Sequence, residues 1–224
     1  MSPSSLSVVI PTLNEQQQIG DAIRSVAAAG AGEVIVSDGG SGDATESVAR
    51  AAGATKWVRS LPGRGTQLNA GASVADRRWL LFLHADSRLT PGCLEPVVAA
   101  GGPPWGAFRQ RIDSPRPIYR WIERGNAARV RLLGMAFGDQ AIFVDRDLFR
   151  KVGGFPDIAL MEDVELSRRL RRIARPRLLP GPVVISPRRW ERRGVVRQTF
   201  RNWSIQVAFR FGVPPETLRT WYER

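Results

Sequence analysis

The sequence predicts an α/β fold, with a mainly parallel central sheet and helices on both faces. Through the first hundred residues, short apolar runs alternate with segments of helical periodicity. This order is typical of parallel strands joined by right-handed helical crossovers. The chain has 224 residues, of which 43% are hydrophobic and 24% charged. That composition is ordinary for a globular domain, and the length suffices to bury a core without disulfides.

The elements of the first half follow one another regularly. The apolar run 7–10, ended by Pro11, predicts a buried parallel strand. Residues 17–29 predict a helix because Ile19, Ile23 and Val26 fall on one face. The other elements expected here are strands at 33–37, 56–59 and 79–83, and helices from Asp43 to about residue 52, over 66–74 and from Pro91 onward.

The second half follows Gly101-Gly102-Pro103-Pro104, which is the clearest internal break. Its expected elements are a strand at the sheet edge over 105–112, a helix over 118–133, a strand within 136–144, a helix over 161–173, a last short strand at 183–185 and a helix over 195–211. We expect one domain over 1–180, with halves of about 1–100 and about 105–180. A basic helical extension over 181–224 is expected to follow it.

The formal net charge of +12 is concentrated in the last quarter of the chain. Residues 168–224 contain 15 arginines and three acidic residues, whereas residues 1–167 are balanced. The simplest explanation for the excess of arginine over lysine is the composition of the genome that encodes the chain. A basic tail can also bind an anionic partner.

Two scarce residue types exclude several classes of site. The single cysteine, Cys93, excludes an intramolecular disulfide framework. The single histidine, His84, excludes a histidine-rich metal site and a triad that uses a second histidine. No apolar stretch reaches the roughly 18 to 20 residues that a spanning helix needs, and the N-terminus lacks the basic segment of a signal peptide. We therefore expect a cytoplasmic protein.

Polar segments follow the predicted strands at the edge where an open α/β sheet binds ligands. They are Pro11-Thr12-Leu13-Asn14-Glu15, Asp38-Gly39-Gly40-Ser41-Gly42-Asp43, Arg64-Gly65 with Asn69, and His84-Ala85-Asp86. Because the carboxyl ends of parallel strands meet at one edge, we expect these four segments to converge on one ligand.

Each segment taken alone has a structural interpretation beside the functional one. Asp38 can accept from a base or a ribose, or it can belong to a Gly-rich turn capped by Asp43; the GGSG spacing is not a dinucleotide fingerprint. His84 and Asp86 lie on the same side of their strand end, where Asp86 can bind a divalent metal or simply end a strand. Acids at a helix start, such as Glu162 and Asp163, either compensate the helix dipole or include a general base.

Five segments in this order resemble the family 2 glycosyltransferases with the GT-A fold. They are VVIPTLNE, VSDGGSGDAT, GRGTQLNAGA, LFLHADSRLTPG and GGFP followed by LMEDVELSRRL. The resemblance runs from about Ser7 to about Leu170. It is strongest to short bacterial members that carry His-Ala-Asp where most relatives have Asp-x-Asp. It implies that the halves 1–100 and 105–180 bind donor and acceptor.

The resemblance also implies a role for individual residues. Asp163 matches the catalytic base, and Asp86 with His84 matches the metal motif for Mn²⁺ or Mg²⁺. Gly138, Asp139, Gln140 and Glu162 fall on the acceptor side. The positions that match nucleotide-sugar contacts are Pro11, Thr12, Asn14, Glu15, Asp38, Gly39, Arg64, Asn69 and Ala85. Such enzymes usually invert configuration, and uracil is the base in many relatives.

Two departures from the family pattern affect the expected chemistry. His84 replaces an acid, so it offsets less of the metal's charge and leaves the metal's identity open. Arg188-Arg189-Trp190 is similar to the Arg-Trp of processive synthases, but the usual preceding glutamine motif and membrane spans are missing. A processive polysaccharide synthase is therefore not expected.

The predicted helix over 195–211 places an apolar stripe on one face. Its members are Val196, Phe200, Trp203, Val207 and Phe211. We expect the stripe to close the domain by packing on the sheet. The alternative is that the helix lies on an anionic membrane and brings the site to a lipid acceptor such as a polyprenyl carrier.

The sequence thus predicts a cytoplasmic glycosyltransferase that moves a sugar from a nucleotide diphosphate donor, such as a UDP-sugar, to a hydroxyl acceptor. The alternative localisation is peripheral association with the inner face of the membrane. A nucleotidyltransferase is the second enzyme class, although no Gly-rich loop with a following Arg and Lys lies near the first strand. A non-catalytic nucleotide- or nucleic-acid-binding module is the remaining alternative, and nucleic acid is not the expected partner because it leaves the four loops unexplained.

Overall fold

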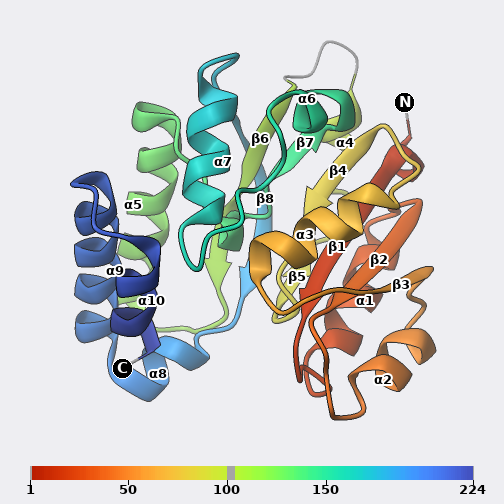
Figure 1. Cartoon of the computed structure of the whole chain (residues 1–224), viewed down its shortest axis with the longest axis horizontal. Coiled ribbons are helices and arrows are strands. Elements are labelled where there is room, and N and C mark those ends of the chain that lie inside the picture. Colours follow the sequence, from red (N-terminus) through yellow and green to blue (C-terminus); the bar gives the residue numbers. More distant parts are fainter. Residues whose placement is uncertain (1, 100–103, 224) are drawn as a thin grey trace.

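A computed structural model describes residues 2–99 and 104–223. Within these ranges the chain forms one eight-stranded sheet in the order β3-β2-β1-β4-β7-β6-β8-β5 (Figure 1). The strands are β1 (Leu6–Thr12), β2 (Glu33–Asp38), β3 (Lys56–Arg59), β4 (Trp79–Phe82), β5 (Ser87–Leu89), β6 (Trp105–Ile112), β7 (Phe143–Asp145) and β8 (Arg177–Ile185). The predicted α/β class is confirmed.

The first four strands pair in parallel. β1 lies between β2 and β4, and β3 pairs with the outer side of β2. Every residue of β2 and β4 is buried, which explains why the middle of β2 (34–36) and all of β4 are uninterrupted apolar runs rather than alternating ones. All four carboxyl ends therefore point to the same edge.

Beyond β4 the sheet is mixed, with β6 and β8 paired in parallel, so parallel pairings are in the majority over the whole sheet, as expected. β7 runs antiparallel to both β4 and β6, and β5 runs antiparallel to β8. The expectation that residues 105–112 form an edge strand was wrong: β6 lies between β7 and β8. The expectation rested on the alternation of exposed Arg109 and Arg111 with buried residues. This alternation also suits an interior strand near a bend.

Helices cover both faces of the sheet, as expected. They are α1 (Ile19–Ala28), α2 (Thr45–Ala51), α3 (Arg64–Ser73), α4 (Glu95–Val98), α5 (Pro117–Leu133), α6 (Arg146–Lys151), α7 (Glu162–Arg171), α8 (Arg188–Arg193), α9 (Val195–Arg210) and α10 (Pro215–Glu223). α1 packs its Ile19, Ile23 and Val26 into one core, while α3 and α7 contribute Leu68, Leu166 and Leu170 to the core on the other face. Pro91 begins a turn rather than a helix, because α4 starts only at Glu95.

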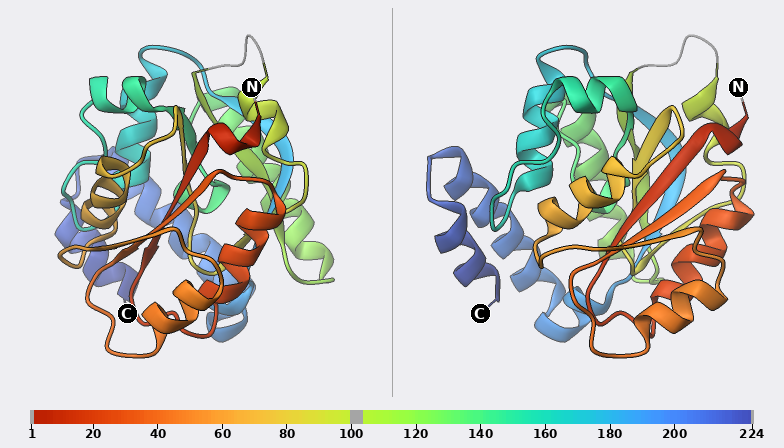
Figure 2. Two further views of the ribbon diagram at one scale, coloured as in Figure 1. Left: turned by 90° about the vertical axis from the view of Figure 1, so that its right-hand side faces the viewer. Right: turned by 45° about the vertical axis from the view of Figure 1, so that its right-hand side comes forward.

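The C-terminal helices α8, α9 and α10 were expected only in part. Figure 1 and the right-hand view of Figure 2 both show α9 and α10 at the end of the molecule opposite α2. They share a small separate cluster in which Ile205 and Leu218 meet Leu160 and Met161. The expectation that the stripe of α9 packs on the sheet was wrong, because all five of its residues are exposed, from 54% at Val207 to 82% at Phe211.

Two further statements complete the architecture. Residues 101–103 of the expected internal break lie outside the described residues, so the division into halves stays a prediction. In the part of the chain that the structure describes, no helix has the length and apolar character needed to cross a membrane.

Candidate active site

Two adjoining pockets lie at the carboxyl edge of the parallel strands. The strand-end pocket, of about 170 Å³, is lined by Pro11, Thr12, Leu13, Glu15, Gln67 and Ala85. The helix-side pocket, also of about 170 Å³, is lined mainly by Phe137, Asp139, Met161, Asp163, Trp190, Gln198, Asn202, Gln206 and Tyr222. Arg64, His84, Asp86 and Arg189 line both pockets and so form their common wall. The arrangement is a two-part cleft with charged groups at its centre.

His84 presents an available nitrogen to this common wall. Its Nε2 atom is buried and has no hydrogen-bond partner among the described residues. Burial, together with the cations of Arg64 and Arg189, lowers the pKa of His84 to about 3. The imidazole is therefore neutral at pH 7, which is the form that binds a metal or accepts a hydrogen bond.

Asp86 lies two residues after His84, beside two arginines. Its Oδ2 atom is 4.0 Å from the Arg188 guanidinium, which also lies 3.8 Å from Glu15. The described part of the chain holds no group of three His, Cys, Asp or Glu side chains placed to bind a metal. A cation at His84 and Asp86 fits their donor types, an orphaned imidazole nitrogen and a carboxylate. A bound diphosphate or water would have to complete its coordination.

Asp163 is held in position by the backbone on both sides of its carboxylate. One oxygen accepts from the N–H of Gly138 at 2.7 Å, and the other accepts from the N–H of Val164 at 2.7 Å. The residue is the second of α7, which begins after Met161 in a left-handed conformation with φ of 71°. The carboxylate faces the helix-side pocket and keeps lone pairs free to accept a proton.

Gly138 allows this close approach. A Cβ at this position would lie 2.8 Å from Nε2 of His84 and 3.2 Å from Oδ2 of Asp163. Both distances are shorter than an ordinary van der Waals contact. The predicted acceptor residue Gly138 is thus a spacer that brings His84 and Asp163 to the same point of the cleft.

Glu162 does not reach either pocket, although it was expected on the acceptor side. Its side chain is almost fully buried and forms an ion pair with Arg64 of α3. Burial raises the pKa of Glu162, and the Arg64 cation partly offsets that effect. Glu162 therefore fixes Arg64 in the wall between the two pockets.

Asp139, another residue predicted on the acceptor side, lines the helix-side pocket. Its Oδ1 atom is buried without a partner among the described residues, and burial raises the pKa of its carboxyl group. Gln140, in contrast, is fully buried away from the pockets, where its Oε1 accepts from Arg129 and from the backbone of Phe137. Its expected acceptor position therefore corresponds to a structural contact.

Several predicted nucleotide contacts are placed in the strand-end pocket, and others are not. Pro11, Thr12, Glu15, Arg64 and Ala85 line it, and the buried hydroxyl of Thr12 has no partner in the described part of the chain. Neither described pocket is lined by Asn14, Asp38, Gly39 or Asn69.

The side chains outside the pockets hold the surrounding loops. Both oxygens of Asp38 accept from its own turn, from the N–H groups of Gly40 and Ser41 and from the Ser41 hydroxyl. Asn14 exchanges hydrogen bonds with that same loop at Ser41 and Gly42. Asn69 pairs twice with the backbone of Phe155, at 2.8 and 2.9 Å. These contacts shape the site from behind.

Sequence reasoning missed the residues that the C-terminal segment supplies. Arg189 lines both pockets and stacks near the Tyr222 ring, 5.3 Å from its centroid. Gln198 is 2% exposed, and its Oε1 has no partner among the described residues. The Arg-Arg-Trp sequence was the available signal, but its similarity to a synthase motif was used only to exclude a processive synthase, and Arg189 was not predicted as a site residue.

Comparison with known proteins agrees with this architecture. Residues 7–101 match the family described as Glycosyl transferase family 2. S. aureus TarS (residues 1–349) in complex with UDP-GlcNAc has a similar fold, with 16% identity and a TM-score of 0.66 over 81% of this chain and 58% of that one. A mycobacterial protein shows 23% identity and a TM-score of 0.60, over 81% of this chain and 65% of its own.

A third solved structure carries ligands. Glucosyl-3-phosphoglycerate synthase from Mycobacterium tuberculosis, in complex with Mn²⁺, UDP and glucosyl-3-phosphoglycerate, is 21% identical with a TM-score of 0.58, over 81% of this chain and 70% of that one. The present chain spans about 60% of the length of the TarS 1–349 fragment. The relatives thus share the fold of this chain and extend beyond it.

Proposed function

We propose that this chain is a glycosyltransferase of family 2 with the GT-A fold, because residues 7–101 match that family, and that it transfers a sugar from a nucleoside diphosphate donor to a hydroxyl acceptor. UDP is the nucleotide we assign to the donor, because TarS and the synthase both have UDP-bound structures. The observation that carries the proposal is the two-part cleft with a charged common wall. Its two parts match two substrates whose reacting atoms must meet.

The strand-end pocket is assigned to the nucleoside part of the donor. Thr12 offers a buried hydroxyl without a partner in the described chain, and Glu15 offers a carboxylate to a ribose hydroxyl or a base N–H. Burial raises the pKa of Glu15. A hydrogen bond donated by the ligand to this carboxylate would oppose that effect by favouring the charged form. We assign Asp38 an indirect role in reading the base. Its oxygens accept hydrogen bonds from its own loop, so it would act by holding that loop in shape.

The common wall is assigned to the diphosphate. The cations of Arg64 and Arg189 line both pockets and would stabilise the charge that develops on the leaving group. Asp86 and the neutral Nε2 of His84 would hold a divalent cation, Mn²⁺ or Mg²⁺, which neutralises diphosphate charge when it is bound. Because the described residues include no third candidate side chain beside these two, we expect metal and nucleotide to bind cooperatively.

Asp163 is assigned the general base. Its carboxylate faces the helix-side pocket and is fixed by two backbone N–H groups. In the proposed step, the acceptor hydroxyl gives its proton to Asp163, its oxygen bonds to the anomeric carbon, and the C–O bond to the diphosphate breaks. A single in-line displacement of this kind inverts the anomeric configuration. The acceptor is a hydroxyl compound, and a lipid-linked one is the specific form we favour.

The test is turnover of a panel of UDP-sugars with Mn²⁺ or Mg²⁺, followed as release of UDP, with the product's anomeric configuration read by NMR. We expect one donor to be turned over at least tenfold faster than the rest once an acceptor is supplied. The same protein should bind UDP without an acceptor. A retained configuration would remove the single-displacement step, and an absence of UDP binding would remove the donor assignment.

A further inference from the structure

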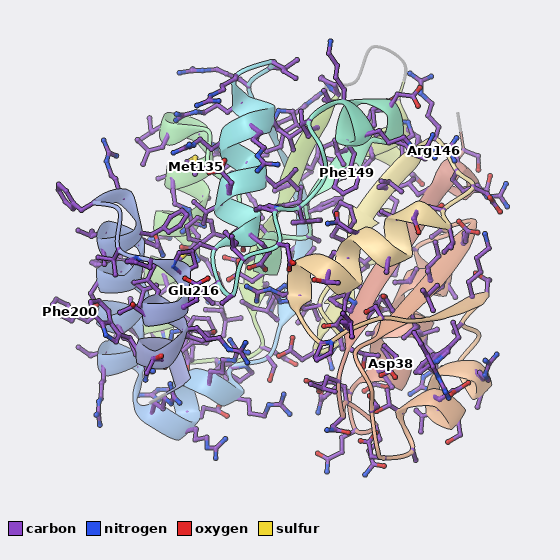
Figure 3. The ribbon with its side chains drawn as sticks, in the orientation of Figure 1. Asp38, Met135, Arg146, Phe149, Phe200 and Glu216 are labelled. Atoms are coloured by element: carbon purple, nitrogen blue, oxygen red, sulfur yellow. The ribbon has the colours of Figure 1, made fainter. Side chains whose placement is uncertain are left out.

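Helix α9 carries apolar side chains on two faces, because Ile205 packs against Leu160 and Leu218 while a second apolar set stays exposed. Gln198, Asn202 and Gln206 turn toward the helix-side pocket, together with the apolar Ile205. The amide of Gln198 donates to Asn202 at 2.8 Å. The stripe of Val196, Phe200, Trp203, Val207 and Phe211 instead faces outward, 54–82% exposed. Figure 3 shows Phe200 at the outer margin of the molecule, on the side away from the sheet.

The exposed stripe is continuous and purely apolar. Its spacings of 4, 3, 4 and 4 residues keep its five members on one face of the helix. Isolated exposed apolar residues are ordinary on a soluble protein, whereas a contiguous patch marks an interaction surface. Three of the five are the aromatic Phe200, Trp203 and Phe211, and Trp, Phe and Leu are typical of the apolar face of a helix that lies in a bilayer interface.

The charge beside the stripe is positive. Arg197 and Arg210 are exposed residues of α9 itself, and Arg192 is exposed on α8. No acidic residue lies in α9, and residues 168–224 hold 15 arginines against three acids. An apolar face bordered by arginine complements an anionic lipid surface, where the apolar side chains enter the acyl boundary and the cations meet the headgroups.

We propose that the α9 stripe docks this chain on an anionic lipid bilayer. The aliphatic Val196 and Val207 of the stripe favour lipid over nucleic acid, because bases stack on aromatic or guanidinium planes and not on valine. The polar face of the same helix lines the helix-side pocket. If the function proposed above holds, docking would place the acceptor part of the cleft against the membrane surface.

The experiment is sedimentation of the full chain with sucrose-loaded vesicles, in the absence of donor and acceptor. Phosphatidylcholine vesicles are compared with vesicles that contain about 30% phosphatidylglycerol, in low and in high salt. We expect binding to the anionic vesicles, a blue shift of tryptophan fluorescence on binding, and weakening by salt. Binding that is absent, or equal on neutral and anionic vesicles, overturns the proposal.

Matched variants separate docking from folding. Phe200→Ser together with Trp203→Ser should reduce vesicle binding at least tenfold with an unchanged melting temperature. Leu61→Ser, an exposed apolar residue in the loop before α3, should leave it unchanged. Arg197→Gln and Arg210→Gln should each weaken binding to anionic vesicles about fivefold.

Two other results would also overturn the proposal. One is a doubled mass in light scattering that Phe200→Ser/Trp203→Ser restores to a monomer, which would make the stripe an interface between two copies. The other is binding of RNA or DNA that the stripe variant loses while vesicles are not bound. The docking experiment contains no donor or acceptor, so its failure does not count against the transferase assignment. That assignment is tested separately by the turnover of UDP-sugars.

Discussion

At the scale of single residues, the site depends on two close approaches at Gly138. Its N–H donates to Asp163, and its missing side chain leaves room for Nε2 of His84. The carboxylate and the imidazole come from distant parts of the sequence, so this glycine determines whether both fit. The sequence singled out Gly138 only through the family resemblance, as a predicted acceptor position, and did not reveal this steric requirement.

Gly138→Ala is expected to lower kcat/KM for transfer at least tenfold. The new methyl group would lie 2.8 Å from the imidazole nitrogen, and a displacement of about 1 Å in an active site can cost on the order of a hundredfold in rate. Gly125→Ala in α5 is the matched control, because nothing lies within 4 Å of its Cβ position. The control should keep full activity and gain up to about 1 kcal/mol of stability. Equal activity of the two variants would contradict this role of Gly138.

Asp163→Asn should reduce kcat by roughly 10²–10⁴-fold, the range that general base catalysis contributes. UDP affinity, measured by calorimetry, should stay within about twofold, because Asp163 lines the helix-side pocket and not the strand-end pocket. Asp139→Asn is the companion variant, since Asp139 also faces the helix-side pocket. If the Asp139 variant loses turnover and the Asp163 variant does not, the base assignment passes to Asp139.

The single histidine makes the pH dependence of stability interpretable. Burial lowers the pKa of His84 to about 3, whereas an unfolded histidine titrates near 6.5. Between these values the unfolded chain binds a proton that the folded chain does not, so stability falls as the pH falls. From pH 7.5 to 5.5 the loss from His84 should be roughly 1.4 kcal/mol.

Denaturant unfolding of the wild type and of His84→Gln at both pH values measures this loss. Carboxyl groups with raised pKa, such as Asp139 and Glu162, act with the opposite sign. They remain in both proteins, so the difference between the two proteins isolates His84. Identical pH dependence in wild type and variant would show that the imidazole is not held neutral.

At the scale of elements, the parallel half of the fold was predictable and the C-terminal part was not. β1, β2, β4, α1 and α5 have strong periodic or continuous apolar patterns, and they lie within a few residues of expectation. β8 begins at Arg177, whereas the sequence predicted a start at residue 183. The prediction was too short because Pro180, Gly181 and Pro182 interrupt the apolar run of this strand. α8 is a short, strongly charged segment that resembles a solvated loop, and α10 was expected only as part of a basic helical extension.

The two faces of α9 offer a direct stability comparison. Ile205 is 2% exposed among Leu160, Met161 and Leu218, so Ile205→Ala should cost about 2–4 kcal/mol of unfolding free energy. Phe200→Ser should change it by no more than roughly 0.5 kcal/mol, as is usual for exposed positions. Chemical denaturation of both variants checks the pair. A large loss at Phe200 would mean that the stripe is packed after all.

At the scale of the whole molecule, the cleft is built by two different parts of the chain. The parallel half supplies the strand-end pocket and the His84–Asp86 pair, while α7, α8 and α9 supply Asp163, Arg189 and Gln198. The first group follows strands in sequence, so the rule that ligands bind at strand ends could find it. Arg189 and Gln198 join the cleft only through tertiary packing, and no sequence pattern revealed them, whereas the resemblance of its segment to the family did single out Asp163.

The same limit explains the predicted nucleotide contacts that turned inward. An amide or carboxylate after a strand can face a ligand or hold a neighbouring loop, and the sequence is the same in both cases. Asn69 holds Phe155 and Asp38 holds Ser41. Orphaned buried atoms such as Nε2 of His84 and Oγ1 of Thr12 separate ligand-facing groups from loop-holding groups, and only a structure provides them.

The central claim is that the charged wall between the two pockets binds the diphosphate of a nucleotide sugar. The measurement that tests it most directly is a calorimetric titration with UDP, with and without Mn²⁺, of the wild type and of Asp86→Asn. We predict tight binding by the wild type that strengthens with Mn²⁺, and loss of the Mn²⁺-dependent part in the variant. At a UDP concentration about 100 times Kd, the folded state should gain roughly 2.7 kcal/mol. Absence of UDP binding by the wild type, with the metal present, would contradict the account.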